Sequence, residues 1–283
     1  MIDSICVYGY HGNIGKHHYR KLSEREDTVD PGTIYTGDYI KLYGVDVGGI
    51  VAYNAFQTDA VILATPSNTH YELAKIAIEG GTHLLVEKPI TLNYKEAQTL
   101  YRLAQTYNVV FYTGHCYRYL PQFRENLPEL FHTPMLDFKL LVKHDKPLSE
   151  AVFDLAIHGI EIAFFLGDQQ KGRNFNLKSA HIGDKSNQIH IEANIGSKHC
   201  KFVVGYGQQE DVRTLKGYNI NGDTEAFVDF HSSDGKEPDA MSNLHAAFIK
   251  SCNVGVFNPE AEHAVAAIQL AEQIQNKLFP KGI

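Results

Sequence analysis

The pattern of apolar and polar positions changes near residue 120 of the chain. Before that point, short continuous apolar runs such as Ser4–Tyr8 and Asp59–Ala64 alternate with segments whose apolar residues recur at helical spacing. Continuous runs are typical of strands covered on both faces, and alternating strands and helices predict a doubly wound parallel sheet. The expected strands are 4–8, 59–64, 82–86 and 109–113, and the expected helices are 13–22, 71–79 and 94–107.

After Pro121 the apolar residues alternate with polar ones, as in 136–142 and 189–195, and similar pieces recur at 201–206 and 225–230. This alternation predicts strands with one buried face in a mixed or antiparallel open sheet, with a helix at 149–166 and two more at the end. The expected domains are therefore 1–119 and 120–283. An open sheet face is commonly buried against another copy, so we expect a homodimer or homotetramer.

Composition narrows the classes of protein further. The 283 residues include 26 Lys and Arg against 33 Asp and Glu, a formal charge of −7, so nucleic acid is an unfavourable partner. No apolar run approaches the roughly 18 residues of a membrane span, and the first residues lack the basic region of a signal peptide. Four cysteines without paired spacing fit a reducing compartment. We expect a cytoplasmic protein that does not bind membranes.

Three glycines, Gly9, Gly12 and Gly15, stand between the first expected strand and the first expected helix. Glycines in this context permit a tight turn, and the N–H groups at the helix N-terminus can bind a pyrophosphate. The segment therefore predicts a dinucleotide site in a Rossmann domain. The alternative is a plain glycine turn, because the spacing is one residue looser than usual. The candidate contacts are Gly9, His11, Gly12, Asn13 and Ile14.

Asp30 follows Gly9 by 21 residues, a distance at which an acidic residue can bind the ribose hydroxyls of a dinucleotide. No Arg follows it to bind a 2′-phosphate, which favours NAD over NADP. The alternative is a simple turn at Asp30-Pro31-Gly32.

A second constellation follows two of the expected strands, at 64–70 and 85–89. Ligands of open parallel sheets bind at the carboxyl ends of strands, so both segments are placed for a binding site. Lys88 is a compact charge that can hold a substrate oxygen. The alternative is that Lys88 merely ends a strand in solvent. Pro89 argues against this alternative, because it restricts the backbone just beyond the lysine.

Asp154 and His158 are four residues apart, so on a helix they share one face. A carboxylate beside an imidazole raises its basicity and selects its tautomer, as a general acid/base requires. The alternative is two polar residues on a solvated helix face, and the apolar neighbours argue against it. No metal site is expected, since the 15 histidines lack paired ligand spacing, and His17 and His18 are expected on the face of a helix.

The sequence resembles the Gfo/Idh/MocA family, named after glucose-fructose oxidoreductase and inositol dehydrogenase. The resemblance rests on GYHGNIGKHH, on ATPSNTHYELAKIAIEGGTHLLVEKP, on TGHCYRYLP, on DLAIH and on the two-domain layout. It departs from the family at Ser149-Glu150, where a Gly pair is usual, and at Glu161, where an Asp is usual. The segment from Gly15 to Asp59 is also shortened.

The resemblance implies roles for residues of this chain. Lys88, in the Glu87-Lys88-Pro89 motif, would contact the reacting hydroxyl and the nicotinamide, and His158 with Asp154 would be the acid/base. Residues expected to line the cofactor are Thr65, Pro66, Asn68, His70 and Glu87, and those expected near the substrate are Tyr117 and Arg118.

The implied function is that of an NAD(P)-dependent oxidoreductase. Hydride would pass between the nicotinamide and a secondary hydroxyl or ketone of a sugar, cyclitol or sugar derivative. One alternative is an enzyme of the same fold that uses NAD transiently for sugar elimination or glycoside cleavage. Another is a nucleotide-binding sensor protein without catalysis.

Overall fold

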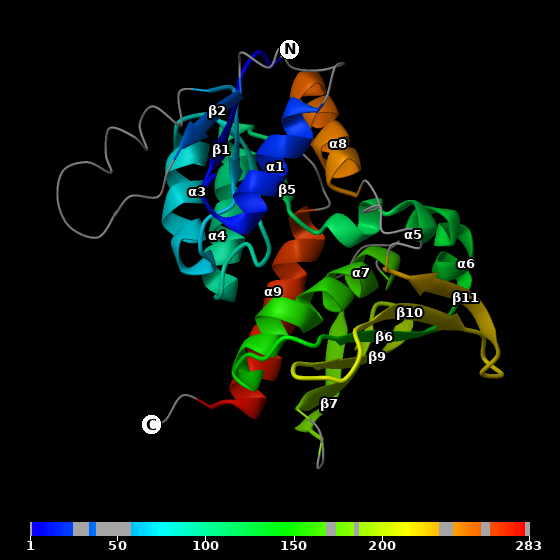
Figure 1. Cartoon of the computed structure of the whole chain (residues 1–283). Helices are drawn as coiled ribbons and strands as arrows, with labels where there is room; N and C mark the ends of the chain where they lie inside the picture. Colours follow the sequence, from blue (N-terminus) through cyan, green and yellow to red (C-terminus); the bar gives the residue numbers. More distant parts are fainter. Residues whose placement is uncertain are drawn as a thin grey trace. The chain divides into compact units, whose positions relative to one another are not determined.

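The computed structural model describes residues 2–24, 34–37, 58–167, 174–183, 187–231, 240–255 and 261–280, with the backbone alone for 34–37. These residues form two compact units (Figure 1). The first unit comprises Met1–Gly114 with Met241–Val265, and the second comprises His115–Ala240 with Ala266–Ile283. Neither unit is continuous in sequence, because a late helix folds with the first 114 residues. That residues 1–119 bind a dinucleotide and residues 120–283 bind the substrate and form the oligomer contact stays a prediction.

The first unit is built on a parallel sheet in the strand order β2-β1-β3-β4-β5. All side chains of β1 and β3 are buried, as the continuous apolar runs predicted. The prediction of a doubly wound parallel sheet is therefore confirmed. The strand bounds are β1 (Ile5–Tyr8), β2 (Ile34–Gly37), β3 (Ala60–Leu63), β4 (His83–Val86) and β5 (Phe111–Thr113).

Helices cover both faces of this sheet. The α1 helix (Asn13–Ser23) leads from β1 to β2, whereas α3 (His70–Glu79) and α4 (Tyr94–Tyr107) connect strands on the other side of β1. Right-handed crossovers therefore place α1 on one face and α3 with α4 on the other. The late helix α8 (Ala240–Val254) lies beside α1 (Figure 1), and the hydroxyl of Tyr112 on β5 is 2.8 Å from that of Ser251 on α8.

The second unit contains a mixed sheet in the order β11-β10-β6-β9-β8-β7, in which only the β6–β9 pair is parallel among the described strands. On β6, the buried Leu136, Phe138 and Leu140 alternate with half-buried neighbours. This confirms the expected open sheet, whereas the oligomeric state stays a prediction. The bounds are β6 (Met135–Leu141), β7 (Phe175–Ile182), β8 (Gln188–Ile195), β9 (Lys198–Gly205), β10 (Val212–Tyr218) and β11 (Thr224–Asp229).

The helix expected at 149–166 differs from the observed segment. A 3₁₀ turn at Leu148–Glu150 precedes a π-helical stretch at Val152–Ala156, and only then α7 (Ile157–Gly167) begins. The α7 helix packs on the buried face of the sheet, where Gly159 lies so close to Phe138 that a Cβ would collide with the ring. The remaining helices are α5 (Pro121–Glu125), α6 (Leu127–His132) and α9 (Ala261–Leu278), with 3₁₀ turns at Ser67–Thr69 and Cys116–Tyr119.

Three strands were missed by the sequence pattern: β2, β7 and β10. The β7 side chains are exposed or half-buried except Ala180, so neither side of the strand carries an apolar series. The β10 strand has a buried series only from Leu215 onward. Strands with little buried surface show only a weak alternation of apolar and polar residues. They form because they hydrogen-bond to a neighbouring strand.

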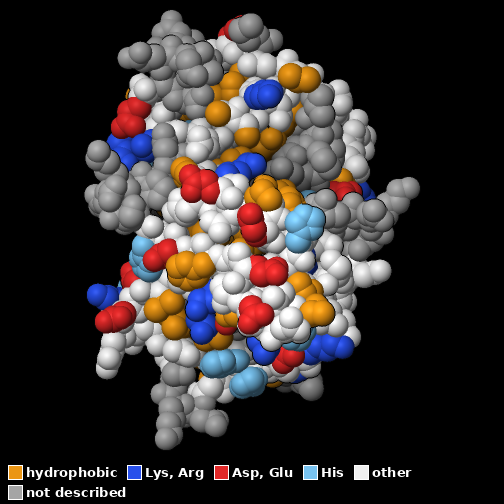
Figure 2. Space-filling view, turned by 90° about the vertical axis from the view of Figure 1, so that its right-hand side faces the viewer, with side chains coloured by type: hydrophobic (Ala, Val, Ile, Leu, Met, Phe, Trp, Pro, Cys, Tyr) orange, Lys and Arg blue, Asp and Glu red, His pale blue; other side chains and the backbone are white. Residues whose placement is uncertain are grey.

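No helix among the described residues is both long and apolar enough to span a membrane. On the face shown in Figure 2, acidic and basic side chains of the described residues are interspersed.

Lys198, at the start of β9, anchors the end of α6. Its side chain is almost fully buried, and its ammonium donates to the carbonyl oxygens of Leu130, Phe131 and Thr133 at 3.0, 2.7 and 2.5 Å. The last carbonyls of a helix lack partners within the helix, and a cation there also complements the helix dipole. This one ammonium therefore joins α6 to the mixed sheet.

Replacing Lys198 by Met should lower the free energy of unfolding by about 2–3 kcal/mol, because three buried carbonyls lose a charged donor. Urea unfolding followed by circular dichroism measures the change. Lys201→Met is the matched control, since Lys201 lies on the same strand with an exposed side chain. Equal stability of the two variants would contradict the anchoring role.

Candidate functional site

The loop from β1 to α1 is packed so closely, against the end of β3 and against itself, that only glycine fits at two positions. A Cβ on Gly9, whose φ is +92°, would overlap the carbonyl of Ala64, and a Cβ on Gly15 would overlap the carbonyl of Gly9. The Gly12 N–H donates to the Gly9 carbonyl at 3.0 Å and closes the turn. The chain thus enters α1 through a tight turn at the carboxyl end of β1, where parallel sheets bind ligands.

The N-terminus of α1 is open to solvent. Gly12 is its N-cap and has no side chain with which to cap the helix, and residues 11–14 are exposed. N–H groups in the first turn of a helix, together with the helix dipole, attract phosphate. The glycine turn and this helix end therefore fit a pyrophosphate, and they include five of the candidate contacts: Gly9, His11, Gly12, Asn13 and Ile14.

The loop after β3 is held by His70, the first residue of α3. Its imidazole is 1% exposed and bridges two loops, with Nε2 at 2.8 Å from the Thr65 carbonyl and Nδ1 at 2.8 Å from the Pro89 carbonyl. His70 therefore supports the loop from inside, whereas Pro66 and Asn68 are exposed on it. The loops after β3 and β4 are joined at the same edge of the sheet.

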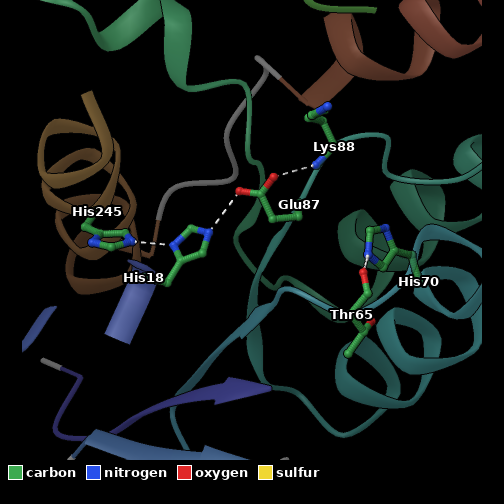
Figure 3. A network of polar contacts seen from close by, with 6 residues as sticks. All are labelled: His18, Thr65, His70, Glu87, Lys88 and His245. Carbon is green, nitrogen blue, oxygen red and sulfur yellow. Dashed lines mark hydrogen bonds and ion pairs between the residues drawn. The ribbon is translucent and has the colours of Figure 1, made fainter. Parts of the chain in front are cut away.

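Glu87 and Lys88 follow β4, and a line of polar contacts lies behind them (Figure 3). The Glu87 Oε1 atom is 2.9 Å from Nε2 of His18, and His18 Nδ1 is 2.8 Å from Nε2 of His245. Both imidazoles are fully buried, and the Lys88 N–H donates to Glu87 Oε2 at 3.2 Å. His18 lies on a face of α1, as expected, and α8 covers that face.

In the second unit, His158 belongs to a stack of rings. The His158 ring lies 4.6 Å from that of Tyr117, and Tyr117 lies 4.7 Å from Phe230 on its other side. Burial raises the pKa of Tyr117 to about 12, although a hydrogen bond with Arg213 acts in the opposite direction. The Tyr117 phenol is therefore a neutral group that keeps its proton beside the imidazole.

Asp154 lies within the π-helical stretch, and π-helical turns are frequent at functional sites. Its Oδ2 accepts hydrogen bonds from the Tyr206 hydroxyl and the Lys146 ammonium, both at 2.7 Å. Burial and the bond with Asp154 raise the pKa of Tyr206, so this phenol remains a donor. The two donors fix the orientation of the Asp154 carboxyl group.

Arg118 is buried rather than exposed to solvent. Its side chain is 4% exposed, and its Nε atom lies 3.0 Å from Oε1 of Glu161, whose side chain is fully buried. The guanidinium also lies 5.0 Å from the centre of the Phe165 ring. The structure thus gives Arg118 an internal partner on α7, and its contact with a substrate stays a prediction.

The structure brings the sequence-predicted residues together in two groups, one in each unit. The glycine turn, the loop 65–70 and Glu87-Lys88 lie at one edge of the parallel sheet. Tyr117, Arg118, Asp154 and His158 belong to the second unit. Asp30 lies outside the described residues. No group of three or more His, Cys, Asp or Glu in the described part of the chain is arranged to hold a metal ion.

Sequence reasoning missed the residues that support these groups: His18, His245, Gly114, Lys146, Tyr206 and Arg213. Their partners are distant in the sequence, as with His18 and His245, which are 227 positions apart. The one local signal was GKHH itself, in which His18 falls on the side of α1 that also carries Gly15 and Leu22. Those three residues are the buried ones of α1, so helical spacing could have placed His18 inside.

Residues 49–115 match a protein family, Gfo/Idh/MocA, that is described as an oxidoreductase family with an NAD-binding Rossmann fold. This match confirms the resemblance carried by the Thr-Pro…His and Glu-Lys-Pro segments, both of which fall inside the matched residues.

Two curated proteins that are similar to this chain have named activities. UDP-N-acetylglucosamine 3-dehydrogenase of Acidithiobacillus ferrooxidans is 34% identical over 114 residues, which are 39% of this chain and 36% of that protein. 2,7-anhydro-N-acetylneuraminate hydratase of Mediterraneibacter gnavus is 36% identical over 179 residues, which are 62% of this chain and 41% of that protein. The aligned parts thus span less than half the length of either relative.

Solved structures share the fold at low identity. The Acidithiobacillus ferrooxidans enzyme superposes with a TM-score of 0.73 at 19% identity and covers 98% of both chains. GenD2 from gentamicin A biosynthesis, in complex with NAD, superposes with a TM-score of 0.74 at 16% identity, over 96% of this chain and 92% of that one. At these identities the likeness shows the fold, a Rossmann domain followed by a mixed sheet.

Replacing Arg118 by Met should lower the free energy of unfolding by about 3–5 kcal/mol, because it leaves the buried Glu161 carboxylate without its cation. Chemical denaturation measures this loss. The double variant Arg118→Met/Glu161→Leu should recover most of it, since no charge is then buried alone. A stable single variant with a raised KM for substrate would instead assign Arg118 to substrate binding.

The stability of the protein should fall as the pH drops below about 6.5, the ordinary histidine pKa. Burial lowers the pKa of His70, and this effect exceeds the opposite effect of the two carbonyls and of Glu87. The unfolded chain therefore binds a proton that folded His70 resists, and stability is lost as the pH falls through the unfolded value. The melting temperature between pH 7.5 and 5.5 should decline less steeply in His70→Gln. Parallel profiles would contradict the assignment.

Proposed function

We propose that the protein is an NAD-dependent dehydrogenase that oxidises a secondary hydroxyl of a sugar or sugar derivative, or reduces the matching ketone. One observation carries the proposal. Lys88 follows β4 at the same sheet edge as a glycine turn that excludes any Cβ at Gly9 and Gly15, in a chain of an NAD-binding oxidoreductase family. A nucleotide bound at this edge would lie beside a cation suited to a substrate oxygen.

The cofactor would be held by the residues of the first unit. The N–H groups of residues 12–14 would bind its pyrophosphate, and the loop 65–70, supported by His70, would line it. NAD, when bound, supplies the site that accepts or returns hydride. NAD is favoured over NADP because no Arg follows Asp30 in the sequence, and the structure of GenD2 contains NAD.

The proton chemistry would be performed by His158. Its ring is 8% exposed and is held by stacking against Tyr117, so its orientation is restricted before any substrate arrives. We assign Lys88 to polarise the substrate oxygen and His158 to take the hydroxyl proton, with Asp154 as the carboxylate that favours the imidazolium. Two hydrogen-bond donors hold the Asp154 carboxyl group in place for that role.

The substrate class follows from the chemistry of the relatives. The Acidithiobacillus ferrooxidans relative is named for oxidation at position 3 of an amino-sugar nucleotide, and a secondary hydroxyl is the group that such a reaction consumes. We propose that this chain also acts on a sugar carbon that bears a secondary hydroxyl.

A second candidate is supported by the Mediterraneibacter gnavus relative, which is named a hydratase and aligns over more of this chain than the dehydrogenase does. Hydration leaves the redox state of the substrate unchanged. An enzyme of this kind would need its nicotinamide only transiently and would release no NADH. Lys88 and His158 would serve either reaction, since a transient oxidation, like the net one, removes a proton and a hydride from a CH–OH group and returns the hydride later.

The protein should bind NAD and oxidise at least one member of a panel of sugars and sugar nucleotides, with NADH formation measured at its absorbance. His158→Ala should lose roughly 10²–10⁴ in turnover yet bind NAD with unchanged affinity by calorimetry, because only proton transfer is removed. His181→Ala is the matched control, an exposed histidine on β7.

The same assays separate the alternatives. Substrate consumption without net NADH, followed by mass spectrometry, would favour the transient use of NAD. NAD binding with no turnover of any sugar would indicate a sensor. An unchanged rate in His158→Ala would remove His158 from the mechanism.

A further inference from the structure

We propose that His18 and His245 are positioning residues that hold the Glu87 carboxylate and, through it, the backbone of Lys88. The inference rests on the proposed function for its catalytic consequence. It assigns to α8, a helix from the C-terminal part of the chain, a part in supporting the reactive lysine.

The contacts form one unbroken line, His245–His18–Glu87–Lys88 (Figure 3). The two imidazoles are fully buried, and the Glu87 side chain is 12% exposed. In such a place every polar atom needs a partner, because water cannot replace one that is lost. The His18 ring lies between its neighbours with both nitrogens engaged, so it can shift only if both contacts break.

The line of contacts has a defined direction when both rings are neutral. The Glu87 carboxylate can only accept, so His18 must donate from Nε2. His18 Nδ1 is then an acceptor, and His245 must donate from Nε2. Each ring thereby selects the tautomer of the next, as a carboxylate–histidine pair does in other sites. At the other end, Glu87 Oε2 accepts the N–H of Lys88 and thus restrains the backbone from which the lysine side chain extends.

Gly114 confines the same carboxylate from another element. It follows β5, and a Cβ built on it would collide with both carboxylate oxygens and the carbon between them. Glu87 therefore sits between a hydrogen-bond donor on α1 and a backbone that approaches closely only because residue 114 is glycine. The carboxylate has two independent restraints, one of hydrogen bonding and one of space, and each can be removed separately.

His245 offers the sharper pair of variants, because it contributes only its Nε2 donor to this line of contacts. His245→Gln keeps an N–H donor at similar reach, whereas His245→Leu fills the space without one. We expect His245→Leu to reduce kcat on the order of 10- to 100-fold, with the Kd for NAD and the KM changed less than about threefold, since a displaced catalytic group costs turnover. His245→Gln should restore most of the loss.

A measurement without substrate tests the structural part alone. In protein labelled with ¹⁵N-lysine, the Lys88 amide can be assigned by its absence in Lys88→Arg. Its resonance should move in His245→Leu and stay near the wild-type position in His245→Gln. Gly114→Ala, which displaces Glu87 while both histidines remain, should move the same resonance, and it keeps the test decisive if His245→Leu does not fold.

The outcomes distinguish this inference from the proposed function. If no sugar is oxidised by the wild-type protein but the Lys88 amide responds as described, the positioning stands and the assigned activity fails. If the Lys88 amide is unmoved in His245→Leu and Gly114→Ala, the inference is overturned whatever the enzyme does. Equal turnover in His245→Leu and wild type, or equal loss in the Leu and Gln variants, would also overturn it.

Discussion

A carboxylate enclosed at the end of β4 constrains much of the first unit. The Glu87 side chain is largely buried, and burying a charge is costly unless hydrogen bonds compensate for it. The compensation comes from His18 on α1, which in turn depends on His245 on α8, while Gly114 leaves the space that the carboxylate occupies. Three elements from distant parts of the sequence must therefore be in place before the backbone of Lys88 is held.

The second unit restrains its candidate site residues in a different way. Tyr117 lies between His158 and Phe230, so the imidazole is oriented by flat apolar contact. Asp154 is oriented by two donors, Tyr206 and Lys146. Restraint of these candidate side chains by packing and by neighbouring hydrogen bonds is what the proposed function needs, because in it a cofactor supplies the redox chemistry and the protein supplies position and proton transfer.

Strong local patterns predicted the elements that they cover. The buried runs of β1 and β3 appeared as continuous apolar segments, and the helix expected at 94–107 is α4, which Asn93 caps with its side chain by accepting from the N–H groups of Lys95 and Glu96. The pattern failed where burial is partial, as on β7, and where the helix type changed, as in the π-helical stretch that contains Asp154. Helices and strands are predicted from the spacing of apolar residues, and that spacing reports neither a partly buried strand nor a change from α- to π-helix.

The sequence by itself determined the fold class and the resemblance to a family. It also showed the glycine turn and the Glu-Lys-Pro and Asp-x-x-x-His segments, because each of these consists of residues close together along the chain. Only the tertiary structure decided that His18 is buried, that α8 folds with the parallel sheet, and that Arg118 pairs with Glu161 inside the second unit. Those facts depend on contacts between residues far apart in the sequence. Hydrophobic periodicity and local motifs do not predict which distant side chain completes a hydrogen bond, because that partner is determined only when whole elements pack together.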